Sequence, residues 1–284
     1  MANELRRLTD RDRWLLDLLH DHRVLTTEHI AQCAFDSRPR ALNRLGQLYQ
    51  RQILDRFRHY QRPGSQSWRW TLGPLGAGVL AAAAGRTLPR PATVRQETLR
   101  LSASGRLPHL LGANGVFTAL HAAARQDATG TTSLGRWWNE TQATRHAGGL
   151  VRPDGHGLWT HGQTQTPFWL EYDTGTETLG QLTTKLTTGY AQLAGTPVCY
   201  PVLFVLPAAA REQHLHAAWN ATGIPDGLTV ATTHTPPTTP DPTAPRSTAA
   251  AGPAGPVWRT WPRPAEAPRL RLSDVGHPGR ASVG

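Results

Sequence analysis

The chain has 284 residues, a formal net charge of +10 at pH 7 and two cysteines, Cys33 and Cys199. That length allows one large or two modest domains, each with a real core. Two cysteines are too few for a zinc ribbon or a disulfide framework, and no apolar run approaches the roughly 20 residues that span a bilayer. The polar start shows no signal-peptide pattern, so we expect a cytoplasmic protein without a membrane partner.

The positive charge is distributed unevenly. Residues 1–100 hold 17 arginines against 9 acidic residues, a balance of +8, whereas the remainder holds 13 basic against 11 acidic residues, a balance of +2. A basic segment beside a nearly neutral one is typical of nucleic-acid contact in the basic part. The alternative is a solvated, arginine-rich surface. We therefore expect double-stranded DNA as a partner of the first part.

Three helical patterns and two strand-like runs occupy the start of the chain. Apolar residues recur at helical spacing in three segments, which begin near Thr9, Leu25 and Ser37. Two short runs rich in β-formers then flank the turn signal Pro63-Gly64, a pattern typical of a β-hairpin. Three helices followed by a hairpin predict a winged helix-turn-helix over residues 8–85.

The third of these helices is expected to enter the major groove, because its first half is rich in side chains that pair with base edges or phosphates. These side chains are Arg38, Arg40, Asn43 and Arg44. The hairpin arginines, expected on the DNA backbone or minor groove, are Arg56, Arg58, Arg62 and Arg69. Winged helices also dock on proteins, and that alternative stays open, although the arginine density favours DNA.

The remainder predicts a second domain and a tail. Residues 86–106 contain Arg, Pro and Ser and are interpreted as a linker, and residues 107–230 follow the order helix, strand, strand, strand, helix, strand. From residue 231 on, Thr, Pro, Ala and Gly predominate, so we expect residues 231–284 to form a disordered basic tail. The whole chain is predicted to be an α+β protein with two folded domains.

Carboxylates gather in the second domain. Asp154 follows a proline, and Glu171 and Asp173 alternate onto one face of the third predicted strand. Such carboxylates repel each other unless a cation lies between them, and Mg²⁺ or Mn²⁺ prefers oxygen ligands of this kind. Water bound to the metal could attack a phosphodiester. The alternative is that these acids are solvated strand residues, against which their aromatic neighbours argue.

Lys185 is the only lysine, since the other 29 basic residues are arginines. It lies twelve residues after Asp173, on the predicted helix that follows. Lysine and arginine are not interchangeable at an exacting site. A lone lysine there could lean over the carboxylates and neutralise a phosphate. The alternative is an ordinary surface lysine without a role.

Together these motifs resemble a known fold. Arg152-Pro153-Asp154-Gly155, followed by Glu171-Tyr172-Asp173 and Lys185, resembles the PD-(D/E)XK nucleases, with the lysine moved from its usual strand position to the helix. With the winged helix, residues 8–206 resemble the replication-relaxation family of plasmids and other mobile elements, which includes MobC-type relaxases. The segment Trp138-Asn139-Glu140 also resembles the corresponding part of that family.

The resemblance implies a divalent-metal-dependent DNA endonuclease, a nickase or relaxase. Asp154 and Glu171 would be metal ligands, Lys185 the cation that faces the phosphate, and Glu140 and Asp173 auxiliary acids that assist with Mg²⁺ or Mn²⁺. Other transfer or replication proteins and a second copy of the chain are further candidate partners. Many proteins of this nuclease fold have lost activity, so the alternative is a DNA-binding protein of replication, transfer or transcription control with a relic nuclease domain.

A different relaxase chemistry has one literal match. His214-Leu215-His216 fits the His-hydrophobic-His pattern of enzymes that combine a metal with a tyrosine nucleophile. However, residues 208–219 have a helical pattern, and side chains two residues apart on a helix diverge by about 200°. Two such histidines could not share a metal ion.

Overall fold

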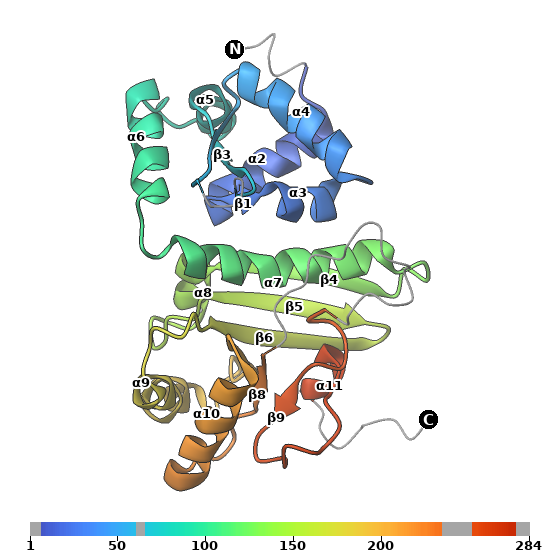
Figure 1. Cartoon of the computed structure of the whole chain (residues 1–284), viewed down its shortest axis with the longest axis vertical. Coiled ribbons are helices and arrows are strands. Elements are labelled where there is room, and N and C mark those ends of the chain that lie inside the picture. The colour runs from blue at the N-terminus through green and yellow to red at the C-terminus, as the bar shows by residue number, and fades with distance from the viewer. Residues whose placement is uncertain (1–6, 61–65, 235–251, 277–284) are drawn as a thin grey trace. The chain divides into compact units, whose positions relative to one another are not determined.

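The computed structural model describes residues 7–60, 66–234 and 252–276, and the chain divides into two units, Met1–Asn114 and Gly115–Gly284 (Figure 1). The first unit combines helices with a three-stranded sheet, and the second contains a six-stranded sheet. This mixture confirms the predicted α+β class. No helix of the described ranges is long and apolar enough to cross a membrane.

The first unit contains three helices, with a short strand between the first two, then two further strands, and then two more helices. In chain order its elements are α2 (Asp10–His22), β1 (Leu25–Thr26), α3 (Thr27–Ala34), α4 (Arg38–Gln50), β2 (Leu54–Phe57), β3 (Arg69–Leu72), α5 (Pro74–Ala83) and α6 (Pro91–Ser102). The strands pair antiparallel in the order β1-β3-β2. The predicted succession of elements is therefore present.

Local hydrogen bonds explain where α2 and α3 begin. Thr9 and Asp12 form a capping box, in which the Asp12 N–H donates to Thr9 Oγ1 over 3.2 Å and the Thr9 N–H donates to the Asp12 carboxylate over 2.8 Å. Thr26 caps α3 in the same way. The buried Trp70 of β3 donates its indole N–H to Thr27 Oγ1 over 2.9 Å, which ties the sheet to α3.

The interpretation of residues 86–106 as a linker is wrong, because α6 forms within them. Its Val94, Thr98 and Leu101 recur at helical spacing and are buried, and Thr98 Oγ1 lies 3.1 Å from Thr71 Oγ1 of β3. Pro91 occupies the first turn, where its missing N–H costs little. The helix was not predicted because only these three positions are buried and many arginines and prolines surround them.

Helix α7 (Leu107–Gln126) contributes to both units. In the first unit, the Asn114 amide donates to the carbonyls of His22 and Val24 over 3.1 and 2.9 Å. In the second unit, Phe117 stacks on Trp137 and Phe168, with ring centroids 5.5 and 5.9 Å apart.

The second unit is built on a sheet with the strand order β4-β5-β6-β7-β8-β9. Its elements after α7 are β4 (Thr132–Asn139), α8 (Glu140–His146), β5 (Gly155–His161), β6 (Thr164–Tyr172), α9 (Leu179–Thr184), a π-helix η1 (Lys185–Gly189), a 3-10 helix η2 (Tyr190–Leu193), β7 (Val202–Val205), α10 (Ala209–Thr222), β8 (Val230–Thr233), β9 (Arg259–Thr260) and α11 (Leu272–Val275). Strands β6, β7 and β8 are parallel to one another, and the other pairs are antiparallel.

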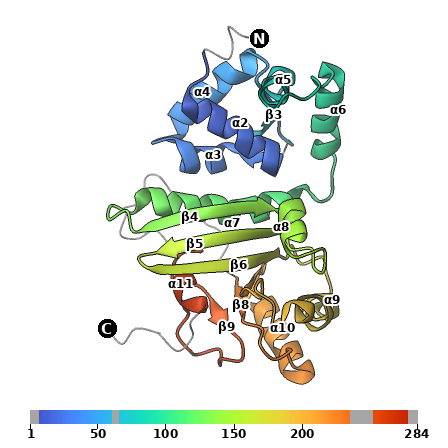
Figure 2. The same cartoon turned by 180° about the vertical axis from the view of Figure 1, so that it is seen from behind.

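Helices cover both faces of this sheet (Figures 1 and 2). On one face, Trp169 packs in a buried cluster with Leu182 of α9 and Trp219 of α10. Phe168 points to the opposite face, where it meets Phe117 of α7. Gly157 makes room there, because a Cβ at this position would lie 2.2 Å from the Phe168 ring. Residues that alternate along β6 thus face two different environments.

The prediction of a disordered tail from residue 231 on is wrong for residues 231–234 and 252–276. Strand β8 extends to Thr233, and β9 pairs with it as the last strand of the sheet. Trp258 is fully buried, and Leu272 and Val275 of α11 are buried too. The order of this segment was not predicted because its few buried apolar residues lie in a sequence rich in Pro, Ala and Gly. The rest of the predicted tail lies outside the described residues.

Candidate functional site

The only lysine meets the buried carboxylate of β6. Lys185 Nζ lies 2.7 Å from Glu171 Oε2 and 3.0 Å from Glu177 Oε2. The Tyr190 hydroxyl donates to the other oxygen of Glu171, Oε1, over 2.7 Å. The structure thus places Lys185 on the same side of the sheet as Glu171, as the sequence suggested.

The π-helix η1 explains how two residues five positions apart reach one carboxylate. In an α-helix Lys185 and Tyr190 would diverge by about 140°. In a π-helix the hydrogen bonds join residues i and i+5, so the two positions come to one side. Both side chains therefore contact Glu171. Such π-helical turns are frequent at functional sites.

The electrostatics of this cluster reflect a second carboxylate. Burial and, next, the negative charge of Asp154 raise the pKa of Glu171 to about 7. Burial alone would lower the pKa of Lys185, but the charges of Glu171 and Asp154 raise it above its usual value, so the amine stays charged. Asp154 Oδ2 accepts the Tyr172 backbone N–H over 2.7 Å. Asp154, Glu171 and Lys185 thus interact as one cluster, which we call the acid–lysine cluster.

The two expected auxiliary acids are paired with arginines instead. Asp173 forms an ion pair with Arg211 of α10, and Glu140 lies 2.5 Å from the guanidinium of Arg152. Among the described residues, no three His, Cys, Asp or Glu side chains are grouped so that they could hold a metal ion. The predicted set of four acids is therefore reduced to Asp154 and Glu171. Sequence spacing gave no sign of Arg211, which is 38 residues from Asp173.

The two histidines of the alternative relaxase motif point in different directions. Both lie on α10, as the helical pattern predicted. His214 is exposed, whereas His216 is buried and its Nε2 lies 2.8 Å from Thr232 Oγ1. The pair cannot bind one metal ion.

On α4, two of the predicted DNA contacts are exposed and weakly held. Arg38 Nε lies 2.9 Å from Glu28, and Arg40 lies 3.2 Å from Asp36 with 74% of its side chain exposed. Exposed ion pairs of this kind contribute about 0–1 kcal/mol, so a phosphate could replace either carboxylate. Asn43 is exposed on the same helix.

Arg44 has a different environment. Its guanidinium lies 2.5 Å from Asp12 Oδ2 and 3.0 Å from Oδ1, and the Asp12 side chain is only 1% exposed. Burial opposes ionisation of Asp12, but hydrogen bonds from Arg44 and Thr9 lower its pKa below the usual value. Arg44 also donates to Gln47, which donates to Asn43 over 2.9 Å. Arg44 therefore holds the fold and orients Asn43.

We expect Arg44→Ala to lower the free energy of unfolding by about 2 kcal/mol, because it removes charge-assisted hydrogen bonds from the buried Asp12. Arg40→Ala is the matched control on the same helix, and its effect should stay within about 0.5 kcal/mol. Urea unfolding followed by circular dichroism measures both. Equal effects of the two changes would contradict this role of Arg44.

The hairpin arginines mostly pack on aromatic rings. The Arg56 guanidinium lies 4.4 Å from the Tyr49 ring centroid and 4.0 Å from that of Trp68, and Arg58 lies 4.2 Å from Trp68. Arg69 is bonded to Gln66, and burial lowers its pKa. Arg58 is exposed. Arg62 lies outside the described residues.

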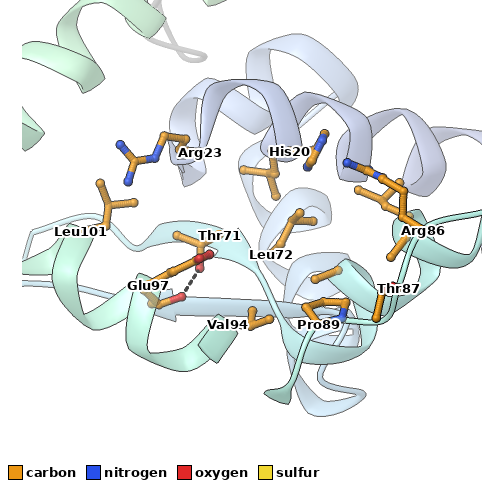
Figure 3. A pocket seen from close by; sticks show the side chains of 15 residues that line it. His20, Arg23, Thr71, Leu72, Arg86, Thr87, Pro89, Val94, Glu97 and Leu101 are labelled. Atoms are coloured by element: carbon orange, nitrogen blue, oxygen red, sulfur yellow. Dashed lines mark hydrogen bonds between the residues drawn. The ribbon is translucent and has the colours of Figure 1, made fainter. Parts of the chain in front are cut away.

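The first unit also contains an apolar cavity of about 320 Å³ that the sequence did not suggest (Figure 3). It lies between α2, β3, α5 and α6, and Leu72 and Val94 line it. Arg23 and Arg86 lie at its two ends, with Glu97 on α6. The sequence-based interpretation of residues 86–106 as a linker did not include α6, which forms one wall of this cavity.

A family model described as replication-relaxation matches residues 16–205, which are 190 of the 284 residues, or about two thirds of the chain. The matched range covers most of the first unit and includes all three members of the acid–lysine cluster. No curated protein and no solved structure matches the chain. On this evidence the chain belongs to the replication-relaxation family.

Proposed function

We propose that the protein acts in replication or relaxation of a plasmid or another mobile element. Its first unit would bind duplex DNA in the manner of a winged helix, and its second unit would nick DNA in the manner of a PD-(D/E)XK nuclease. The observation that carries the nicking proposal is the contact of Lys185 with the buried Glu171 beside Asp154.

Two carboxylates in this cluster fit a hard divalent cation. Asp154 raises the pKa of Glu171, and a cation near both would relieve that repulsion. Mg²⁺ often uses only one or two carboxylates and completes its shell with water and phosphate oxygens. Asp154 and Glu171 would therefore hold Mg²⁺ or Mn²⁺, which when bound supplies an acidic water and a positive charge at the phosphate.

The protein's own groups would position the reacting phosphate. The Lys185 ammonium, which stays charged, would neutralise a non-bridging oxygen as charge builds up there. Tyr190 fixes one oxygen of Glu171 and so sets its orientation. Glu177 shares the ammonium over 3.0 Å and is more exposed than Glu171, so phosphate would replace Glu177 rather than Glu171.

One observation favours a second function, DNA binding without strand scission. Both oxygens of Glu171 already have partners, Lys185 and Tyr190. A buried acid with all its hydrogen bonds made can serve as a structural ion pair. Such a protein would act in replication, transfer or transcription control through its first unit.

Incubation with supercoiled DNA separates these functions. Nicked circles that form with Mg²⁺ or Mn²⁺, and not with EDTA, are the result we expect. Salt-dependent DNA binding without strand scission in the presence of either metal ion would support DNA binding as the only function. A covalent adduct through tyrosine would contradict hydrolysis.

The proposed role of α4 in DNA binding predicts how the salt dependence of DNA affinity changes when its arginines are replaced. We expect the double variant Arg38→Gln, Arg40→Gln to bind duplex DNA more weakly and to reduce the slope of log affinity against log salt by about 1.8, because each lost phosphate contact removes about 0.9. Fluorescence anisotropy over a salt series measures this slope.

The control is Arg95→Gln, Arg100→Gln, which removes the same charge from α6. Figures 1 and 2 show α6 and α4 on opposite sides of the first unit. This control should keep the slope of the unmodified protein. If both double variants changed the slope equally, α4 would have no special part in DNA binding.

A further inference from the structure

The cavity of the first unit is large enough to hold a small molecule. Its volume is about 320 Å³, and protein pockets that bind small ligands measure about 300–1,000 Å³. Its walls come from α2, β3, α5, α6 and the loop before α6, all of them parts of the first unit (Figure 3). Each of the helices and the strand contributes an apolar side chain, namely Leu19, Leu72, Leu80 and Val94. An apolar body of limited size would therefore fit.

Two hydroxyl groups of the lining have a hydrogen to spare. Thr71 Oγ1 of β3 lies 3.1 Å from Thr98 Oγ1 of α6, and both residues are buried. Each hydroxyl has one hydrogen to donate, and the bond between the two uses only one of them. The other hydrogen has no acceptor among the described residues. A buried donor without an acceptor is costly, so a ligand with an acceptor oxygen would supply the missing partner.

Charged side chains without partners lie at both ends of the cavity. Arg86 lies at one end and Arg23 at the other, where Glu97 of α6 also lies (Figure 3). None of these three side chains forms an ion pair or a hydrogen bond with any residue that the structure describes. In Figure 3 the Arg86 side chain extends toward His20 of α2, which lines the cavity too. One end of the cavity thus combines a guanidinium with an imidazole.

The balance of these charges decides which sign of ligand would bind. Two arginines and one glutamate line the cavity, a surplus of one positive charge. Glu97 partly offsets Arg23, whereas Arg86 has no acidic side chain of the lining beside it. A guanidinium binds the oxygens of an acid through several N–H donors at once. An anion at Arg86 would therefore gain such bonds without displacing a carboxylate of a described residue.

We propose that this cavity binds a small amphipathic organic acid. Its anionic group would pair with Arg86 and His20, and its apolar body would lie against Leu72 and Val94. An apolar side chain of a partner protein would fill the same space but would leave the guanidinium and the spare hydroxyl hydrogen without acceptors. An acid with an apolar body meets both needs. This site lies in the first unit, apart from the acid–lysine cluster, and the inference does not depend on nicking or on DNA binding.

Two fluorescent probes with the same apolar body test the proposal on the full chain. The first, 1-anilinonaphthalene-8-sulfonate, carries an anionic sulfonate, and the second, N-phenyl-1-naphthylamine, is the same molecule without it. Fluorescence titration measures the affinity of each probe. We expect one sulfonate probe to bind per chain, at least ~10-fold more tightly than the neutral probe, because only the sulfonate can accept charge-assisted hydrogen bonds from Arg86.

Three variants locate the bound probe. Arg86→Gln should weaken binding of the sulfonate probe about 10-fold and leave binding of the neutral probe unchanged. Arg100→Gln is the matched control, because Arg100 is exposed on α6 and does not line the cavity, and it should change neither affinity. Ala77→Trp would fill the cavity from α5 and should weaken binding of both probes. Arg86 is exposed, so its replacement keeps the test valid if Ala77→Trp fails to fold.

Three results would overturn the proposal. The first is that the sulfonate probe does not bind the unmodified protein. The second is equal affinity for the two probes, which would mean that an uncharged group, such as an apolar side chain of a partner protein, suits the cavity as well. The third is that Arg86→Gln binds the sulfonate probe as tightly as Arg100→Gln does.

Discussion

Arg269→Ala is expected to lower the free energy of unfolding by about 4 kcal/mol at pH 7, although Arg269 lies in a segment rich in proline and alanine. Its guanidinium lies 2.5 and 3.1 Å from the two carboxylate oxygens of Glu212, whose side chain is only 3% exposed. Loss of the arginine would leave a buried carboxylate without its cation and would release the segment that carries β9 and α11.

The effect should depend on pH in a defined direction. Hydrogen bonds from Arg269, Thr232 and His234 outweigh burial and lower the pKa of Glu212 from 4.5 to about 2. A lowered folded-state pKa stabilises the protein above the unfolded value, and this contribution is lost as the pH falls from about 4.5 towards 2. The difference between Arg269→Ala and the unmodified protein should therefore be largest near neutral pH and should shrink below pH 4.

Urea unfolding at pH 7 and at pH 3.5 measures both parts of this prediction. Arg271→Ala is the control, because Arg271 is exposed and only two residues away. It should change stability by less than about 0.5 kcal/mol. A similarly small effect of Arg269→Ala at pH 7 would mean that the C-terminal segment contributes little to the second unit.

Lys185→Met is expected to reduce metal-dependent nicking at least ~100-fold while DNA affinity stays the same. The change keeps the length of the side chain and removes only the charge that would stabilise the phosphate in the transition state. Without the ammonium, Glu171 loses the group that opposes its raised pKa, so more of it would be protonated at pH 7. Both the loss of the ammonium charge and the protonation of Glu171 should lower the nicking rate.

The matched control is Arg152→Met, which removes a charge from the neighbouring motif. Arg152 is paired with Glu140, outside the acid–lysine cluster. The nicking rate of Arg152→Met should remain within a few-fold of that of the unmodified protein. If the two variants lost activity to the same extent, a general loss of positive charge would explain the effect and Lys185 would have no specific role.

Much of the order of elements could be predicted from the sequence, because it depends on local signals. Thr9 and Thr26 cap helices through residues three positions away, and apolar residues recur at helical spacing behind them. Helix α6 and the C-terminal segment were missed for a physical reason. Few apolar side chains anchor each of them, among many prolines and arginines, and their stability comes from surfaces formed elsewhere in the fold.

The candidate site could be predicted only where the sheet brings neighbouring strands together. Asp154 immediately precedes β5, Glu171 lies on its antiparallel partner β6, and Lys185 follows on the next helix, so their order already suggested proximity. The pairing of Asp173 with Arg211 depends on how α10 packs, which spacing does not reveal.

The acid–lysine cluster is tested most directly by the single-turnover rate of nicking of supercoiled DNA in saturating Mg²⁺. Asp154→Asn should lower this rate at least ~100-fold with unchanged DNA affinity, because it removes a carboxylate proposed to hold the ion. Glu140→Gln, whose carboxylate is paired with Arg152, should retain the rate within a few-fold. Equal rates for Asp154→Asn and the unmodified protein would contradict the assignment of this cluster as the nicking site.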